Sequence, residues 1–290
     1  MKLRDLAGSA IATAFLIASA AAADASPATV YFPSADGHTQ LVGYLFAPST
    51  PGPHPAVVML HGRAGPYSAN SNKDCTLVAK DTQSNCNAAT LSKRHQAWGD
   101  YWAAHGYLAL LPDSFGPRNK AHGFGRDSHD DPDRDDVNER DVRPLDAEGA
   151  LKFLQARDDV TPSRVFLQGW SNGASTTLNM MYRQAQSRTS GFHAALAFYP
   201  GCGPRALISQ DYKTAAPVTV LLGSDDEEVS PIVCHRVLDA AASQGSPITL
   251  VDYQGATHDF DDPGKNRQSV PANATAREDA MKRAAEIFGK

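Results

Sequence analysis

The segment Gly169-Trp170-Ser171-Asn172-Gly173 has the pattern G-x-S-x-G, which suits a serine hydroxyl to nucleophilic attack. An apolar run at 165–168 precedes this segment and a helical pattern follows it, so we expect a sharp turn between a strand and a helix. Such a turn exposes the hydroxyl above the edge of a sheet, and the helix N-terminus beneath it favours developing negative charge. The segment therefore predicts acyl-transfer chemistry with Ser171 as the nucleophile.

A serine nucleophile needs a base, and the base needs an acid that orients it. His258 comes shortly after an apolar run at 248–253 and is the predicted base. Asp226 comes shortly after the run 217–222 and is the predicted acid, with the neighbouring Asp225 as the alternative. The carboxyl ends of parallel strands meet at one edge of a sheet, so the predicted base and acid should both lie beside the serine.

Stabilising the oxyanion that forms during attack requires two backbone N–H donors. The amide of Asn172, directly after the nucleophile, is the first predicted donor. The second comes from the loop after the apolar run 56–60, which reads His61-Gly62-Arg63-Ala64-Gly65, and the amide of Arg63 is the one we expect. The side chain of Arg63 is expected in solvent, with contact to a substrate carboxylate as the alternative.

Short runs rich in β-forming residues alternate with helical patterns along most of the chain. The predicted strands are 28–32, 40–46, 56–60, 107–111, 165–168, 194–199, 217–222 and 248–253. The predicted helices are 91–105, 145–157, 172–187, 231–243 and 275–288. Most runs from residue 56 onward are continuously apolar, as in strands buried on both faces of a parallel sheet, whereas the first two alternate like an antiparallel edge pair. The order predicts an α/β fold with an eight-stranded, mostly parallel sheet and helices on both faces.

Two polar segments, 63–90 and 115–143, fit neither pattern. Long irregular segments in a compact domain are often lids or binding loops, and a solvated insertion is the alternative. The second segment contains an acidic run, which includes Asp127, His129, Asp130, Asp131 and Asp133. Its oxygen ligands could hold a divalent cation, but the spacing is not that of an EF-hand, so we expect neither a metal nor a cofactor.

The N-terminus has the layout of a secretory signal peptide. Lys2 and Arg4 precede an apolar run at about 10–18, and small residues then offer a cleavage site before Asp24. The run is shorter than the roughly 18–20 residues that span a bilayer, so no integral membrane association is expected. We expect residues 1–23 to be removed and 24–290 to form a single catalytic domain, exported to the periplasm or secreted.

Composition agrees with an exported globular protein. The chain has 290 residues, is 42% hydrophobic and has a net charge of −5, which gives enough apolar material for a core and no basic footprint for nucleic acid. Its four cysteines form an even set, which in an exported chain favours two disulfides. Three pairings are possible; Cys75–Cys86, which closes a short polar loop, is favoured, and four unpaired thiols are the alternative.

These motifs together resemble the dienelactone hydrolase family of the α/β-hydrolases. The resemblance covers roughly residues 38–288 and rests on HGRAG at 61–65, LLPDSFGPR at 110–118, GWSNGA at 169–174, AFYPGCG at 197–203, GSDDEEVSPIVC at 223–234 and THDFD at 257–261. It implies an esterase or lactonase that acts on a small molecule without a metal cofactor. Founding members use a cysteine nucleophile where this chain has Ser171, which argues against dienelactone itself as the substrate.

The resemblance also implies the second disulfide. The YPGC and PIVC segments recur in exported relatives, and they place Cys202 and Cys234 after adjacent strands at the catalytic edge, where a bridge would brace the loop of the acid. Two other functions compete with ester hydrolysis: a serine peptidase of related fold, and an exported ligand-binding protein without activity. Related peptidases often carry a large extra domain, for which the chain has little room, and the complete set of nucleophile, base and acid argues against a protein that only binds.

Overall fold

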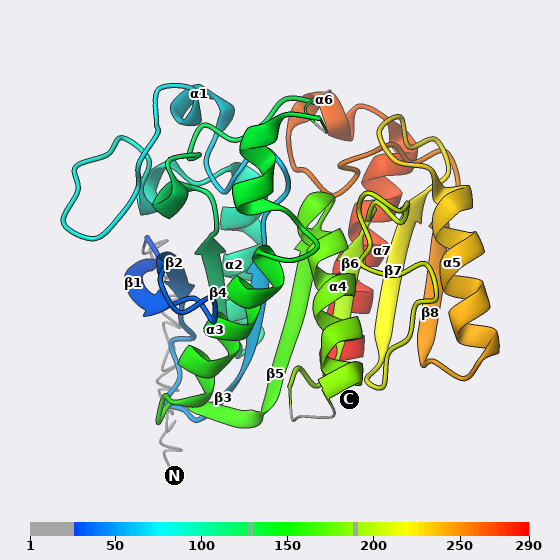
Figure 1. The fold of residues 1–290 in the computed structure, drawn as a ribbon, viewed down its shortest axis with the longest axis horizontal. Helices are drawn as coiled ribbons and strands as arrows, with labels where there is room; N and C mark the ends of the chain where they lie inside the picture. The colour runs from blue at the N-terminus through cyan, green and yellow to red at the C-terminus, as the bar shows by residue number, and fades with distance from the viewer. Residues whose placement is uncertain (1–25, 127, 129, 188–190, 290) are drawn as a thin grey trace, which may run out of the picture.

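The computed structural model describes residues 26–126, 128, 130–187 and 191–289 (Figure 1). The predicted signal peptide at 1–23 lies outside the described residues, as do Asp127 and His129 of the acidic run. Eight strands are present, each with ends within five residues of the predicted bounds, and all belong to one sheet in the order β1-β2-β4-β3-β5-β6-β7-β8. Their bounds are β1 (Ala28–Pro33), β2 (Gln40–Phe46), β3 (His54–Leu60), β4 (Leu108–Asp113), β5 (Val160–Trp170), β6 (Ala195–Phe198), β7 (Val218–Gly223) and β8 (Ile248–Tyr253).

The strand pairing follows the difference in hydrophobic pattern along the chain. β1 pairs antiparallel with β2, and β2 pairs antiparallel with β4, so the two alternating strands form the edge of the sheet as expected. The remaining strands are parallel to one another, with Val57 of β3 opposite Phe166 of β5 and Gly169 of β5 opposite Ala197 of β6. The eight-stranded, mostly parallel sheet is therefore confirmed.

The five predicted helices are also present, as α2 (Lys93–Ala104), α3 (Arg143–Gln155), α4 (Asn172–Ser187), α5 (Pro231–Ser243) and α7 (Pro271–Phe288). Gly106 follows α2 with a φ of +81°, a conformation that glycine adopts without steric cost, and Pro144 lies in the first turn of α3. Shorter elements lie between them: α1 (Ala69–Asn72), α6 (Lys265–Gln268) and the 3₁₀ segments η1 (Ala88–Thr90), η2 (Gly116–Arg118) and η3 (Pro132–Val137).

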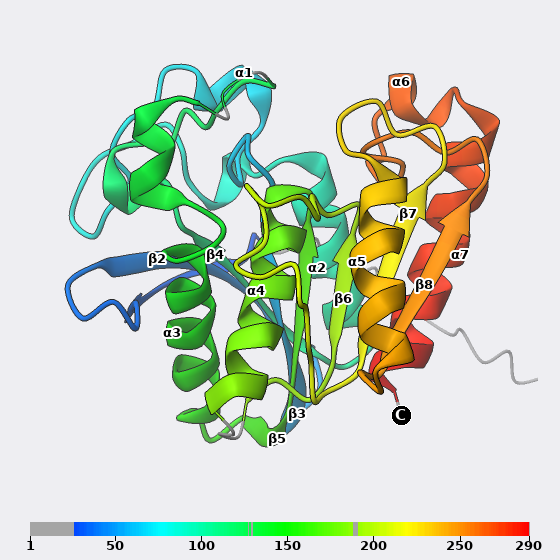
Figure 2. The same cartoon turned by 45° about the vertical axis from the view of Figure 1, so that its right-hand side comes forward.

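The sheet lies between two layers of helices, each of which forms its own core with one face (Figure 2). Helices α3, α4 and α5 pack on one face through Leu154, Leu178 and Leu238, all without exposed surface. Helices α2 and α7 pack on the other face, where Trp102 stacks on Phe288 at a ring-centroid distance of 5.1 Å. Burial of one such large apolar side chain contributes roughly 1.5–3 kcal/mol, so this core holds the strand ends firmly.

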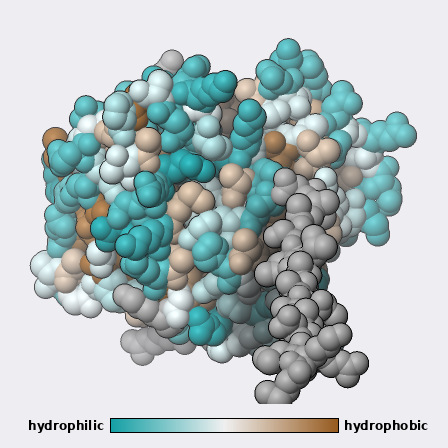
Figure 3. Space-filling view, turned by 180° about the vertical axis from the view of Figure 1, so that it is seen from behind, coloured by the Kyte–Doolittle hydropathy of each residue, from teal (hydrophilic) through white to brown (hydrophobic). Residues whose placement is uncertain are grey.

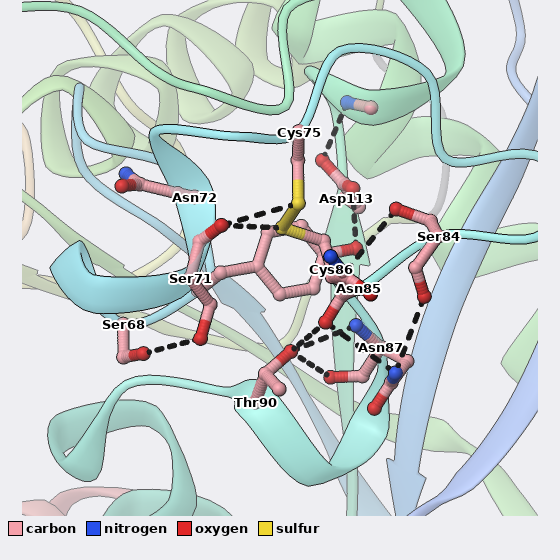
Figure 4. The surroundings of a disulfide bond; sticks show 12 residues. Ser68, Ser71, Asn72, Cys75, Ser84, Asn85, Cys86, Asn87, Thr90 and Asp113 are labelled. Atoms are coloured by element: carbon pink, nitrogen blue, oxygen red, sulfur yellow. Dashed lines mark hydrogen bonds between the residues drawn. A yellow bond between two sulfur atoms is a disulfide. The ribbon is translucent and has the colours of Figure 1, made fainter.

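The segment 63–90 is folded around the disulfide Cys75–Cys86, which was expected (Figure 4). The hydroxyl of Thr90 donates a hydrogen bond to the carbonyl oxygen of Asn85 at 3.0 Å and accepts one from the amide of Asn87 at 2.9 Å. These contacts fix the turn next to Cys86, and with the disulfide they give a polar segment a defined shape without a long helix or strand.

Part of the segment 115–143 packs against the rest of the molecule, while other described residues of it, Asp130 and Asp133 among them, have exposed side chains. Phe115, Phe124 and Val137 form a small apolar cluster of their own. The amide of Phe124 donates to the carbonyl oxygen of Arg63 at 2.9 Å, and the amide of Ala121 donates to that of Thr76, also at 2.9 Å. The two polar segments are thus joined to each other and to the loop after β3.

On the face opposite to that of Figure 1, hydrophobic residues are scattered among hydrophilic ones (Figure 3). The large hydrophobic side chains exposed among the described residues are Tyr31, Leu77 and Ile232. In the part of the chain that the structure describes, no helix has the length and apolar character needed to cross a membrane.

Candidate active site

Ser171 lies in the turn between β5 and α4, in a strained backbone conformation. Its φ is +52°, in the left-handed region that non-glycine residues rarely adopt. A Cβ atom at Gly169 would lie 2.2 Å from the carbonyl oxygen of Gly173, and one at Gly173 would lie 2.1 Å from that of Leu60. Both positions therefore need glycine, because the turn brings strand and helix together as the sequence pattern predicted.

The structure brings Ser171, His258 and Asp226 together. The Nε2 atom of His258 lies 3.0 Å from Oγ of Ser171, and its Nδ1 atom lies 2.8 Å from Oδ2 of Asp226. The other oxygen of Asp226 accepts hydrogen bonds from the amides of Glu228 and Val229, at 2.8 and 2.9 Å. Asp225 is exposed and accepts a hydrogen bond from the hydroxyl of Ser224, so Asp226 is the acid that lies against the histidine.

A buried polar cluster supports the far side of the His258 ring. The ring of Tyr199 lies 4.6 Å from that of His258, and its hydroxyl donates to Asp261. Asp261 also accepts hydrogen bonds from the indole N–H groups of Trp98 and Trp170, each at 2.8 Å. Trp170 of the G-x-S-x-G segment thus packs beneath the nucleophile and holds this cluster in place.

The pKa of His258 is raised above its ordinary value of 6.5. Burial opposes a charged imidazole and is the largest single influence, but the hydrogen bond to Asp226 and the negative charges nearby outweigh it. The carboxylates that contribute are Asp226, Asp259 and Glu228. The site therefore favours a protonated imidazole, the form a base takes after it accepts a proton.

The two predicted oxyanion donors lie next to the nucleophile. A Cβ atom on Gly62 would lie 3.7 Å from Cβ of Ser171, so the loop after β3 packs directly against the serine turn. Within the described residues, neither the amide of Arg63 nor that of Asn172 donates a hydrogen bond. Both amides therefore stay available as donors in segments that pack against each other at Ser171, and an oxyanion hole needs two such donors.

One buried cation joins the segments that bear these two amides. The guanidinium of Arg143 donates to the carbonyl oxygen of His61 at 2.7 Å and also to the side-chain oxygen of Asn172. Arg143 has no exposed surface, and burial lowers its pKa to about 10. Sequence reasoning missed this residue, because nothing local to the N-terminus of α3 indicates that its side chain reaches the serine turn.

Ser171 opens onto two small cavities. The first, of about 50 Å³, has a mostly polar lining that includes three of the predicted site residues and several other charged side chains. That lining is Arg63, Arg126, Arg134, Glu139, Ser171, Asn172, Ser175, Gly201, Ala206, Glu228 and Val229. The second, of about 280 Å³, lies between the loop after β3 and α2 and reaches Tyr67 of the segment 63–90. A larger hollow of about 740 Å³ between α3 and α4 contains none of the predicted site residues.

An ion cluster that sequence reasoning did not identify lies at the smaller cavity. Both oxygens of Glu228 accept hydrogen bonds from one terminal nitrogen of Arg63, at 2.9 and 2.8 Å, and Arg126 donates to the same carboxylate at 2.9 Å. The side chain of Arg63, expected in solvent, is therefore paired with a carboxylate of the protein. The only sequence signal was that Glu228 follows the predicted acid by two residues.

The second disulfide joins Cys202, just after β6, to Cys234, near the start of α5. The loop that bears Asp226 lies between β7 and α5, so the bridge fixes one end of the helix that follows this loop. Both disulfide pairings given in the sequence analysis are therefore present, and the described part of the chain has no free cysteine.

The acidic run of the segment 115–143 has carboxylates that could in principle bind a metal ion, but three of them have other partners. Asp130 pairs with Arg205 and Asp133 with Lys120, while the carboxylate of Asp131 accepts the amide of Asp133. Among the described residues, no three His, Cys, Asp or Glu side chains are grouped in a way that could hold a metal ion. Each of these three carboxylates therefore has a partner within the protein.

Comparison with known proteins gives a family and a fold. Residues 89–290 match the model of the family described as the dienelactone hydrolase family. A search of the curated proteins found no match. The fold is similar to that of a dienelactone hydrolase-like promiscuous phosphotriesterase from metagenomic libraries, with 20% identity and a TM-score of 0.65 over 91% of this chain and 98% of that chain. It is also similar to esterase 2 of Thermogutta terrifontis, with 16% identity and a TM-score of 0.62 over 91% and 94%.

Proposed function

The chain belongs to the dienelactone hydrolase family, and from that premise we propose that it is a serine hydrolase that cleaves a small carboxylic ester or lactone. The observation that carries the proposal is the continuous pair of contacts from Ser171 to His258 at 3.0 Å and from His258 to Asp226 at 2.8 Å. A base within hydrogen-bond distance of the nucleophile, oriented by a buried acid, is the arrangement that activates a serine.

In the proposed first step, Oγ of Ser171 attacks the ester carbonyl while Nε2 of His258 accepts the hydroxyl proton. The amides of Arg63 and Asn172 donate hydrogen bonds to the oxyanion of the tetrahedral intermediate. When the intermediate collapses, the bond from carbon to the leaving oxygen breaks, and the imidazolium gives its proton to that oxygen. An ester thereby releases an alcohol, whereas an opened lactone keeps its hydroxyl on the acyl group.

In the second step, water attacks the acyl-enzyme and His258 again acts as the base. The acid product leaves, and the proton returns to Oγ of Ser171. Asp226 keeps Nδ1 of the ring protonated, so that Nε2 is free to accept a proton, and its negative charge stabilises the imidazolium. Asp226 is placed for this role because its side chain has no exposed surface and its second oxygen is held by two amides of its own loop.

We also propose that residues 24–290 act as one exported catalytic domain after removal of residues 1–23. Two disulfides support this proposal, because such bridges persist in oxidising compartments and are rare in reducing ones.

The proposal is tested by turnover of 4-nitrophenyl esters of graded acyl length and of a series of lactones. Wild-type protein should hydrolyse short members, and Ser171→Ala should lose activity by about 10³-fold or more while keeping the fold. Ser243→Ala, at an exposed position on α5, is the matched control and should retain full activity. Undiminished turnover by the Ser171→Ala protein would overturn the assignment, and cleavage of peptides without cleavage of esters would favour the peptidase alternative.

A further inference from the structure

Glu228 lies on the side of the His258 ring opposite to Asp226. One carboxylate oxygen of Glu228 is 3.7 Å from Nε2 of His258, the same nitrogen that contacts Ser171. The side chain is only 8% exposed, and it lines the smaller cavity together with the serine. The imidazole is thus flanked by two carboxylates, one at each ring nitrogen.

Two arginines from separate loops hold Glu228 in this place. Arg63 comes from the loop after β3, whose amide is a proposed oxyanion donor, and Arg126 comes from the segment 115–143. Glu228 itself is in the loop between β7 and α5. The carboxylate therefore connects three loops around the nucleophile, and its position does not depend on one flexible side chain alone.

The distance of 3.7 Å between Glu228 and Nε2 of His258 is short enough for the carboxylate to act on the imidazole electrostatically. Opposite charges this close attract each other strongly where water is partly excluded, so a carboxylate at this position favours the imidazolium. At this cavity Arg63 and Arg126 offset part of the negative charge of Glu228. Without these arginines the carboxylate would favour the protonated form of His258 more strongly, and a protonated imidazole cannot accept the serine proton.

We propose that Glu228 is a positioning residue that stabilises the His258 imidazolium from its Nε2 side, and that Arg126 sets how strongly it does so. The proposal rests on the proposed serine hydrolase function, because the imidazolium forms when Ser171 transfers its proton. In this account Asp226 orients the ring, whereas Glu228 adjusts the basicity of the nitrogen that takes the proton.

Several other charged or titratable groups surround His258 and must stay unchanged in a test. Asp226, Glu227, Asp259 and Tyr199 lie against His258 itself. Three arginines pair with the neighbouring carboxylates: Arg94 of α2 with Asp259, Arg267 of α6 with Glu227, and Arg63 after β3 with Glu228. The test therefore changes only Glu228 and Arg126, and it compares shifts of opposite sign.

The first experiment measures kcat/KM for 4-nitrophenyl acetate against pH. Glu228→Gln should move the acidic limb of the profile down by about one pH unit and lower the plateau by about threefold to tenfold, since a stabilising charge on the imidazolium is lost. Arg126→Gln should move the limb upward, by about half a unit, because Glu228 then acts with less compensation. A loop that was merely loosened would not give shifts of opposite sign.

The double variant Glu228→Gln with Arg126→Gln separates direct from indirect action. If Arg126 acts through Glu228, the limb of the double variant should coincide with that of Glu228→Gln. A further upward shift would mean that Arg126 acts on His258 without Glu228, either directly or through Glu227, which lies 3.8 Å from Arg126, and would overturn the proposed coupling. An unchanged acidic limb in Glu228→Gln would overturn the role of Glu228.

The second experiment does not depend on activity. The pKa of His258 is measured by NMR titration in Ser171→Ala protein, with and without Glu228→Gln, and should fall by about one unit when Glu228 is neutralised. If ester turnover survives Ser171→Ala, the proposed function fails. If turnover is lost but Glu228→Gln leaves the pKa of His258 unchanged, the proposal about Glu228 alone fails.

Discussion

The two sides of the His258 ring are built differently. On the Nδ1 side, Asp226 has no exposed side-chain surface and is held by hydrogen bonds from amides of its own loop. On the Nε2 side, the ring meets Ser171 and Glu228 beside a cavity, and the arginines that pair with Glu228 have side chains 24% and 51% exposed. Burial fixes the position of the ring on its Nδ1 side. On the Nε2 side, the charge close to the ring depends on ion pairs whose arginines are exposed to water and salt.

Removing the buried carboxylate should have the largest effect. Asp226→Asn should lower kcat/KM for 4-nitrophenyl acetate by about 10⁴-fold, because the amide no longer selects the tautomer of His258 or stabilises the imidazolium. The measurement is steady-state kinetics near pH 8, with folding checked by circular dichroism.

Asp225→Asn is the matched control, since this neighbour is exposed and hydrogen-bonds to Ser224. It should change the rate by less than about twofold, because surface substitutions away from a site have small effects. Equal losses in the two variants would contradict the assignment of Asp226 and remove the contrast between the two sides of the ring.

The two disulfides lie in different segments that border the site, and their loss should have intermediate effects. Cys202–Cys234 spans 32 residues and anchors α5, the helix after the loop of Asp226. Cys75–Cys86 spans 11 residues in the segment 63–90, which lines the cavity of about 280 Å³ at Ser171. From loop entropy, paired Cys→Ser substitutions should lower the free energy of unfolding by about 4 and about 3 kcal/mol, respectively. Urea denaturation measures both values.

Kinetics of the same two variants sharpen the comparison. Loss of Cys202–Cys234 should reduce kcat, because it loosens the loop that bears Asp226. Loss of Cys75–Cys86 should mainly raise KM, because its segment contributes Tyr67 to the wall of the cavity of about 280 Å³. The reverse assignment of kcat and KM effects would contradict this division.

The smallest effect concerns the pH dependence of the wild-type enzyme. The raised pKa of His258 means that the ring stays protonated up to a pH above 6.5, and a protonated ring cannot accept the serine proton. Activity should therefore fall as pH decreases through a midpoint above 6.5, measured as kcat/KM for 4-nitrophenyl acetate. A midpoint clearly below 6.5 would show that burial outweighs the surrounding carboxylates.

Features that depend on local sequence were predictable. Continuous apolar runs located the parallel strands, and the glycines around Ser171 identified the turn, because each signal lies within a few residues of the feature it specifies. The choice between Asp225 and Asp226 needed the structure, because the spacing in the sequence allows either. In the structure the carboxylate of Asp226 is buried against His258, whereas that of Asp225 is exposed.

Features that join distant segments were not predictable. Arg63, Arg126 and Glu228 are separated by up to 165 positions, and nothing local indicates that they meet. Arg143 is similar, because a charged residue at the start of a helix is ordinarily exposed, yet here it is buried beneath the serine turn. The folded form of the segment 115–143 also depends on contacts with Thr76 and Arg63 that its own composition does not suggest.

The central claim, that Ser171 is an activated nucleophile, is tested most directly by intact-protein mass spectrometry after treatment with a fluorophosphonate. Attack by Oγ of Ser171 forms an oxygen–phosphorus bond, releases fluoride and transfers the hydroxyl proton to His258. We expect a single adduct per wild-type chain, mapped to Ser171, and none in Ser171→Ala protein. Absence of labelling in folded wild-type protein, or labelling that persists in Ser171→Ala, would contradict the account.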